Sequence, residues 1–307
     1  MEAQVGGQAV IEGVMIRSPK YIATAVKSPN GKIYLKKDKY NSFAKKYKLN
    51  NIPVIRGAVI LIESLVIGIK ALMWSAEIAS DESEQNEEKS DKNKKGSFFQ
   101  KLSMVFSLIL GLSLGIGLFF YLPLYLTDLL GIKEGILFNI VDGIIRLIIF
   151  GLYIFLISLW KEFRRIFEFH GAEHKSIYSY ENGEKLTVEN ARKHSTLHPR
   201  CGTSFLLIVM ITSMIVFIFL GRPDSISDKL IRFLFIPVIA GISYEILKFS
   251  GKFKQNSIVK LLILPGLMLQ KVTTKEPSDE QLYIGLTALK YSLDDIPVSE
   301  PDIILIS

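Results

Sequence analysis

The four histidines and the single cysteine of this chain all lie between His170 and Cys201. His170 and His174 are four positions apart, so on a helix both imidazoles would share one face and could bind the same metal ion. Glu173 stands beside the second histidine and completes H-x-x-E-H, the inverse of the H-E-x-x-H zinc-hydrolase signature. In that signature the glutamate takes a proton from metal-bound water. The spacing therefore predicts a zinc site with Glu173 as general base.

A second cluster, His198-Pro199-Arg200-Cys201, would supply a third or a fourth ligand. Three protein ligands leave a position for water and favour catalysis. Four ligands close the site and favour a structural metal in a protein that binds or assembles. The spacing of these residues does not distinguish a catalytic site with three ligands from a structural site with four. A capped amphipathic helix with surface histidines and an inert cysteine is less favoured, because unrelated histidines have no reason to crowd together.

The composition indicates that these residues are positioned by a membrane protein. Of 307 residues 49% are hydrophobic, yet 22% are charged, so polar and apolar stretches must be segregated. We predict a mainly α polytopic membrane protein with about four transmembrane helices within residues 101–250. Four segments approach the roughly 20 apolar residues that a helix needs to cross the hydrocarbon core. They are residues 102–126, 136–160, 204–220 and 230–249.

The distribution of basic residues sets the expected orientation. The connection at 161–203 carries eight Lys and Arg, whereas 127–135 carries one and 221–229 carries two. By the positive-inside rule, the N-terminus and the predicted metal site face the cytoplasm. The net charge of +7 is explained by these loops, and we find no specific nucleic-acid signal. The start of the chain has no signal-peptide pattern, and one cysteine is compatible with a reducing compartment.

The flanking segments are expected to be cytoplasmic. Residues 1–52 read as a small, partly β portion with a hairpin around Asn30-Gly31. Residues 80–100 read as a disordered charged linker. Residues 251–307 read as a C-terminal segment with a helix at 279–290, for which Ser278 and Gln281 have capping-box spacing. The last ten residues carry no prediction.

Residues 53–79 are apolar but contain Arg56, Glu63 and Lys70 at seven-residue intervals, roughly along one helical face. We predict an amphipathic helix at the membrane surface or against the spanning helices, and a full span is the less favoured alternative.

Two further sets of charges fall inside the predicted spans. Asp142 and Arg146 are one helical turn apart, where pairing lowers the cost of placing either in lipid, so we interpret the pair as structural. Glu245 lies near the cytoplasmic end of the last span. It is a candidate ligand or anchor for a histidine, and pairing with Lys248 is at least as well supported.

Five strings together resemble the YqhQ-like bacterial membrane proteins, a domain of unknown function labelled a predicted metal-dependent enzyme. The resemblance implies a bacterial cytoplasmic membrane protein and names no substrate. Within its motifs the expected metal ligands are His170, His174, His198 and Cys201, the expected catalytic residues are Glu173 and Arg200, and further candidates are Glu12 and Glu245; His194 lies outside. The strings are G-G-Q-A-V-I-E-G-V-M (6–15), H-G-A-E-H-K (170–175), H-P-R-C-G-T-S-F (198–205), A-G-I-S-Y-E (240–245) and P-G-L-M-L-Q-K-V-T-T-K-E-P (265–277).

The leading hypothesis is a membrane-embedded zinc hydrolase with a cytoplasm-facing His/Glu/Cys site. The first alternative is a membrane binding or assembly protein with a structural metal. The second is an oligomeric channel or transporter whose path is lined by glycine-rich spans and by Asp142 and Arg146. The lipid bilayer is the expected partner, while the substrate and the formation of a homo-oligomer are left open.

Overall fold

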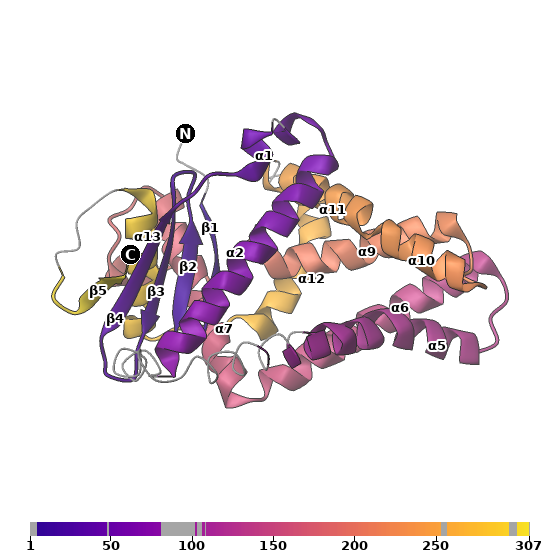
Figure 1. The fold of residues 1–307 in the computed structure, drawn as a ribbon, viewed down its shortest axis with the longest axis horizontal. Coiled ribbons are helices and arrows are strands. Elements are labelled where there is room, and N and C mark those ends of the chain that lie inside the picture. Colours follow the sequence, from indigo (N-terminus) through magenta and orange to yellow (C-terminus); the bar gives the residue numbers. More distant parts are fainter. Residues whose placement is uncertain are drawn as a thin grey trace.

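The computed structural model describes residues 5–47, 49–80, 102, 106–107, 109–252, 257–294 and 300–306. A small β-sheet with its covering helices lies at one end, and a bundle of long helices extends away from it (Figure 1). The linker predicted at 80–100 falls almost wholly outside the described residues.

The sheet has five strands in the order β1-β2-β3-β4-β5. The first four pair antiparallel with their chain neighbours, and β5 pairs parallel with β4, with Ile303 opposite Ile33. The predicted hairpin is present between β3 and β4, where Gly31 takes a positive φ of 84° and the Asn30 side chain accepts the Lys32 backbone N–H at 2.9 Å. The strands are β1 (Gly6–Val10), β2 (Gly13–Arg17), β3 (Tyr21–Lys27), β4 (Ile33–Lys39) and β5 (Ile303–Ile306).

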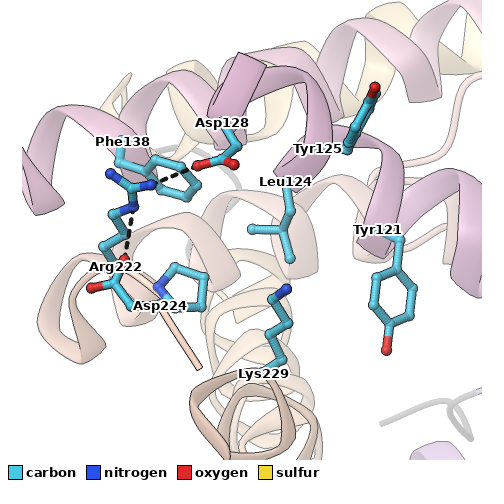
Figure 2. A pocket seen from close by; sticks show the side chains of 9 residues that line it. Tyr121, Leu124, Tyr125, Asp128, Phe138, Arg222, Asp224 and Lys229 are labelled. Atoms are coloured by element: carbon cyan, nitrogen blue, oxygen red, sulfur yellow. Dashed lines mark hydrogen bonds and ion pairs between the residues drawn. The ribbon is translucent and has the colours of Figure 1, made fainter. Parts of the chain in front are cut away.

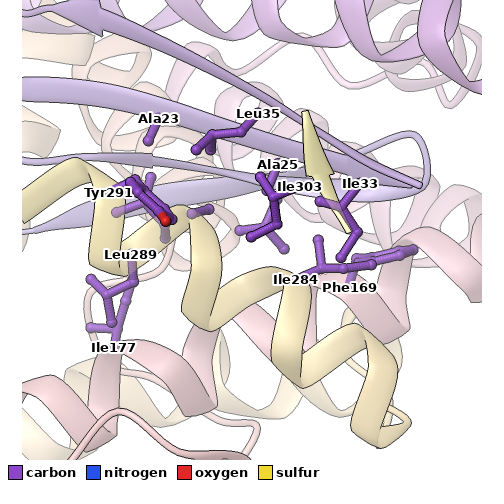
Figure 3. Close-up of a cluster of buried hydrophobic side chains, with 13 residues drawn as sticks. Ala23, Ala25, Ile33, Leu35, Phe169, Ile177, Ile284, Leu289, Tyr291 and Ile303 are labelled. Atoms are coloured by element: carbon purple, nitrogen blue, oxygen red, sulfur yellow. The ribbon is translucent and has the colours of Figure 1, made fainter. Parts of the chain in front are cut away.

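Alternating side chains give the sheet two buried faces. One face packs on α7 (Lys161–Glu181) and α13 (Asp279–Leu293) through a core that includes Leu35, Phe169 and Leu289 (Figure 3). The other face packs on α2 (Ile55–Ala79). α13 covers the helix predicted at 279–290, and its Ser278–Gln281 capping box is formed.

Five helices among the described residues are long and apolar enough to cross a membrane. Four of them correspond to the four predicted spans, which confirms a mainly α polytopic architecture; the fifth is α2. They are Ile55–Ala79, Ile109–Leu129, Gly135–Ser158, Gly202–Leu220 and Ile226–Ser250. Ile109–Leu129 contains the π-helical turn η2 (Gly117–Tyr121) followed by α5 (Leu122–Leu129), and Ile226–Ser250 comprises α10 (Ile226–Leu234) and most of α11 (Ile236–Lys252). The other two are α6 (Gly135–Ser158) and α9 (Gly202–Leu220).

α2 differs from the other four because it runs across the end of the bundle rather than along it (Figure 1). Its second half packs on the sheet through Ala71 and Ile78. Its first half meets α11 where Gly57 lies against Gly241 and Tyr244. Close approach requires glycine at position 57, since a Cβ there would come within 2.7 Å of the Tyr244 Cβ.

The remaining helices connect these layers. α12 (Ser257–Thr273) contacts α9 and α6 and leads back to the sheet through α13. The short elements are α1 (Phe43–Lys46), η1 (Leu49–Asn51) and α8 (Val188–Arg192).

Candidate metal centre

α7 carries the H-x-x-E-H segment to the junction of sheet and bundle. The chain leaves α6, turns at Leu159 and Trp160, and begins α7 at Lys161. α7 then packs on β1, β2 and α13. His170 and His174 lie on one face of this helix with their ring centroids 4.5 Å apart, as their spacing predicted.

Three predicted ligands converge. Nε2 of His170 lies 3.1 Å from Sγ of Cys201, and one ligand atom from each of His170, His174 and Cys201 lies within 4.8 Å of the others. His174 is 1% exposed and Cys201 is 6% exposed. Zn–N bonds of about 2.0 Å and Zn–S bonds of about 2.3 Å place tetrahedral ligand atoms roughly 3.5 Å apart, so small side-chain movements would let these atoms share one ion.

Hydrogen bonds at the far side of each imidazole fix its orientation. Nδ1 of His170 donates to the backbone carbonyl of Thr273 at 2.8 Å, and Nδ1 of His174 donates to the carbonyl of Thr196. A carbonyl can only accept, so both rings carry their proton on Nδ1 and present the Nε2 lone pair. Histidines that bind a metal through one ring nitrogen usually donate the N–H of the other to such an acceptor.

Electrostatics also suit His174 to be a neutral ligand. Burial lowers its pKa, against smaller opposing effects that include hydrogen bonds to Cys201 and to the Thr196 carbonyl. Cys201 precedes the first turn of α9, where its Sγ lies 3.0 Å from Oγ1 of Thr203.

Glu173 lies beside the three ligands on the side of α7 that faces the sheet. It is 5% exposed, and burial raises its pKa, while the imidazoles of His170 and His198 and a hydrogen bond from the Gly7 backbone act in the opposite direction. Gly7 must be glycine for this contact, because a Cβ there would lie 2.5 Å from the Met15 carbonyl oxygen and 3.1 Å from Cγ of Glu173. The G-G-Q string of β1 is thus placed against the H-x-x-E-H helix.

His198 is near the three ligands but is oriented differently. Its ring centroid lies 5.6 Å from that of His174. Its Nδ1 accepts the Arg200 backbone N–H at 3.3 Å, and its Nε2 lies 3.4 Å from a carboxylate oxygen of Glu181. Both ring nitrogens therefore face groups other than the shared ligand position.

Arg200 pairs through its guanidinium with Glu181. Glu181 was not predicted as part of this site, because it lies seven residues beyond His174 outside every recognised string.

Gln270 was also missed. It is fully buried and joins the His198 segment to α12 and α9: its Oε1 accepts the His198 N–H at 2.7 Å, and its Nε2 donates to the His198 carbonyl at 2.8 Å and to Oγ of Ser204 at 2.9 Å. Its presence in the string 265–277 was the available signal.

The two remaining carboxylate candidates are occupied elsewhere. Glu12, at a positive φ of 54° in the β1–β2 turn, pairs through both carboxylate oxygens with Arg165 of α7. Glu245 of α11 accepts Nε of Arg56 at 2.6 Å. The structure brings neither into the group of His170, His174 and Cys201.

Comparison with known proteins agrees with the quoted strings. A family model described as "Protein of unknown function (DUF1385)" matches residues 52–295. The chain belongs to the DUF1385 family. It is also 33% identical over 288 residues to "Uncharacterized protein YqhQ" of Bacillus subtilis (strain 168), which covers 92% of this chain and 89% of that protein. No solved structure matches. The resemblance to YqhQ-like proteins is confirmed, and the DUF1385 match includes every member of the three-ligand group.

Proposed function

We propose that this DUF1385 protein is a zinc-dependent hydrolase whose site lies where a cytoplasmic sheet meets a membrane helix bundle. The observation that carries the proposal is the orientation of His170 and His174. Each has its Nδ1 fixed on a backbone carbonyl, and both share a position with Sγ of Cys201. Imidazole and thiolate together favour zinc over magnesium or calcium.

The arrangement favours three ligands over four. Nδ1 of His198 accepts the Arg200 backbone N–H and its Nε2 lies 3.4 Å from a carboxylate oxygen of Glu181, so we assign His170, His174 and Cys201 as the ligand set. A three-ligand zinc retains a position for water and lowers the pKa of that water to about 7.

The protein groups around the ligands have distinct roles in this proposal. Glu173 is the general base, since it directly precedes the second ligand in the chain, the imidazoles of His170 and His198 act on its carboxyl, and burial raises its pKa. Arg200 is a positioning residue, since its backbone holds His198 and its guanidinium holds Glu181.

A hydrolysis assay tests the proposal. Zinc-loaded protein in detergent is offered a panel of p-nitrophenyl carboxylic and phosphate esters, and Glu173→Gln is compared with Glu162→Gln, an exposed glutamate on the same helix. We expect Glu173→Gln to lower kcat by about 10²–10⁴-fold with zinc retained. Equal activity in both variants contradicts the assignment of Glu173.

One observation favours the second candidate, a structural metal. The cluster joins three separate segments, because His170 lies on α7, Cys201 begins α9 and Thr273 ends α12. A metal there would stabilise the junction of sheet and bundle. This alternative predicts that zinc removal lowers the unfolding temperature sharply while Glu173→Gln has no effect on any activity.

A further inference from the structure

A second group of charged side chains is buried far from the candidate metal centre, inside the helix bundle. Asp142 and Arg146 lie on α6, and Arg232 lies on α10; they are 1%, 7% and 1% exposed. Both helices belong to candidate membrane spans. The predicted one-turn pair is formed, with Nη2 of Arg146 2.7 Å from Oδ2 of Asp142.

Arg232 is the second buried arginine of this group. The group contains only one carboxylate, that of Asp142. Its Nη2 donates to Oδ1 of Asn139 at 2.7 Å and to the Gly221 carbonyl at 2.6 Å, and both acceptors are neutral. The neighbouring carboxylate on α10, Asp228, accepts from the backbone and side chain of Ser225 in a capping box.

Both guanidinium groups contact the ring of Phe217 on α9. The Cζ atoms of Arg146 and Arg232 are 5.4 and 4.7 Å from its centroid. With Asp142 ionised, the three buried side chains carry a formal charge of +1. Outside this group, the half-buried carboxylate of Asp228 also acts electrostatically on Arg232.

Three buried polar atoms of this same group are without a hydrogen-bond partner among the described residues. They are Nη1 of Arg232, Nε of Arg146 and Oδ1 of Asp142. A buried hydrogen-bonding group that is left unsatisfied is destabilising, and more so when the group is charged. A net charge in hydrocarbon is more costly still, so polar groups at this depth are functional candidates.

An open pocket lies among residues of α5, α6 and α10 and of the segment that precedes α10 (Figure 2). It encloses about 420 Å³ and is lined by residues including Phe138, Arg222 and Lys229. Phe138 directly precedes Asn139, which holds Arg232, and Lys229 lies one helical turn before Arg232 on α10. The pocket is thus lined by residues that neighbour the buried group in the chain.

The pocket entrance has no net charge of its own. Arg222 pairs with Asp128 at 2.6 Å and with Asp224 at 2.9 Å, and Lys229 balances the second of these carboxylates. The formal positive charge of the buried group is therefore interior, at Arg146 and Arg232.

We propose that Arg146 and Arg232 form an intramembrane binding site for one small monovalent inorganic anion. One such ion neutralises the group and accepts from the unpartnered guanidinium nitrogens. Oδ1 of Asp142, an acceptor, would repel the ion, so the ion lies on the arginine side. The site is independent of the metal-dependent function proposed above.

Chloride is the probe for the test. The unfolding temperature of the delipidated full chain in neutral detergent is measured in sodium chloride and in sodium gluconate at equal ionic strength. Ligand binding to the folded state raises this temperature. We expect chloride to raise it by a few degrees in the wild type and in Arg222→Gln, a matched control at the entrance, but not in Arg232→Gln. Asp142→Asn should increase the shift.

Equilibrium dialysis of the wild type with radiolabelled chloride provides a readout that needs no folded variant, and one saturable ion per chain is expected. No saturable binding, or an equal chloride shift in Arg232→Gln, overturns the proposal. An Arg232-dependent shift that appears with phosphatidylglycerol and not with chloride also overturns it, because the ligand would then be a lipid headgroup.

Discussion

Nε2 of His170 lies 3.1 Å from Sγ of Cys201, although the two residues are separated by 31 positions in the chain. His170 belongs to the helix that supports the sheet, and Cys201 begins a helix of the bundle. The contact therefore joins the sheet end of the molecule to the helix bundle.

The position of α7 against the α12–α13 connection depends on a glycine beside the first ligand. A Cβ at Gly171 would lie 2.0 Å from the backbone carbonyl oxygen of Lys275, only two residues after Thr273. Gly171→Ala should displace the Thr273 carbonyl from His170, lower bound zinc severalfold and destabilise the fold by about 1–3 kcal/mol.

Gly202→Ala is the matched control, since Gly202 follows the third ligand and a Cβ there meets nothing within 4 Å. Elemental analysis and thermal unfolding of both variants check the prediction. Equal zinc content in the two would contradict it.

The number of ligands can be measured directly. The purified wild type should hold close to one zinc per chain. The His170→Gln variant should not, because the substitution removes one of three ligands. His198→Gln should keep it, since both ring nitrogens of His198 face Arg200 and Glu181. Zinc content of the two purified variants, each shown folded by circular dichroism, decides the matter; loss in both would indicate a four-ligand site.

The sequence predicted which residues form this site better than it predicted how their side chains are oriented. Helical periodicity placed His170 and His174 on one face, and short spacing placed His198 near Cys201. The backbone of His198 is held by Gln270, which is 72 positions away, and no local pattern encodes such a contact. The Thr196 and Thr273 carbonyls could not be foreseen either, because backbone acceptors leave no signature in residue type.

α2 should have both ends on the same side of the membrane. Arg56 at its start pairs with Glu245, near the end of the Ile226–Ser250 span, and Ile78 near its other end packs on the sheet. Both anchors lie at the sheet end of the bundle. An impermeant thiol reagent should label neither Asn51→Cys nor Ser80→Cys in intact cells, and should label both once the membrane is permeabilised.

The wild type is the background for this experiment, because Cys201 is buried. Labelling of one cysteine from outside and protection of the other would show that α2 spans the membrane.

Periodicity alone could not show whether α2 lies at the membrane surface or spans the membrane, since its composition suits either arrangement. Its contacts with α11 and the sheet are long-range and decide its direction. The last strand was missed for a related reason. Ile303–Ile306 is short, and it becomes a strand by pairing with β4 across almost the full length of the chain.

Glu300 should make stability depend on pH at the acidic end. Nζ of Lys290 donates to it at 2.6 Å and the Tyr291 hydroxyl at 2.5 Å, which together lower the pKa of Glu300 to about 2. A carboxyl whose folded pKa is depressed contributes stability above its unfolded pKa of about 4.3, and this contribution is lost as pH falls toward 2. Glu300→Gln should cost about 1–2 kcal/mol at pH 7, allowing for partial exposure of the pair.

Thermal unfolding of Glu300→Gln beside the wild type, from pH 7 to pH 3, checks this. The difference in unfolding temperature should shrink as the pH falls below about 4.3. A difference that stays constant across this range would show that the carboxylate charge is not responsible.

Metal content is the most direct test of the central claim. The detergent-purified wild type and His174→Ala are dialysed against zinc at neutral pH, freed of excess ion and analysed by elemental mass spectrometry. We predict close to one zinc per wild-type chain and a large loss in His174→Ala, because His174 contributes one of three convergent ligand atoms. Folded wild-type protein that retains no zinc, nickel, cobalt or iron would contradict the proposed metal centre.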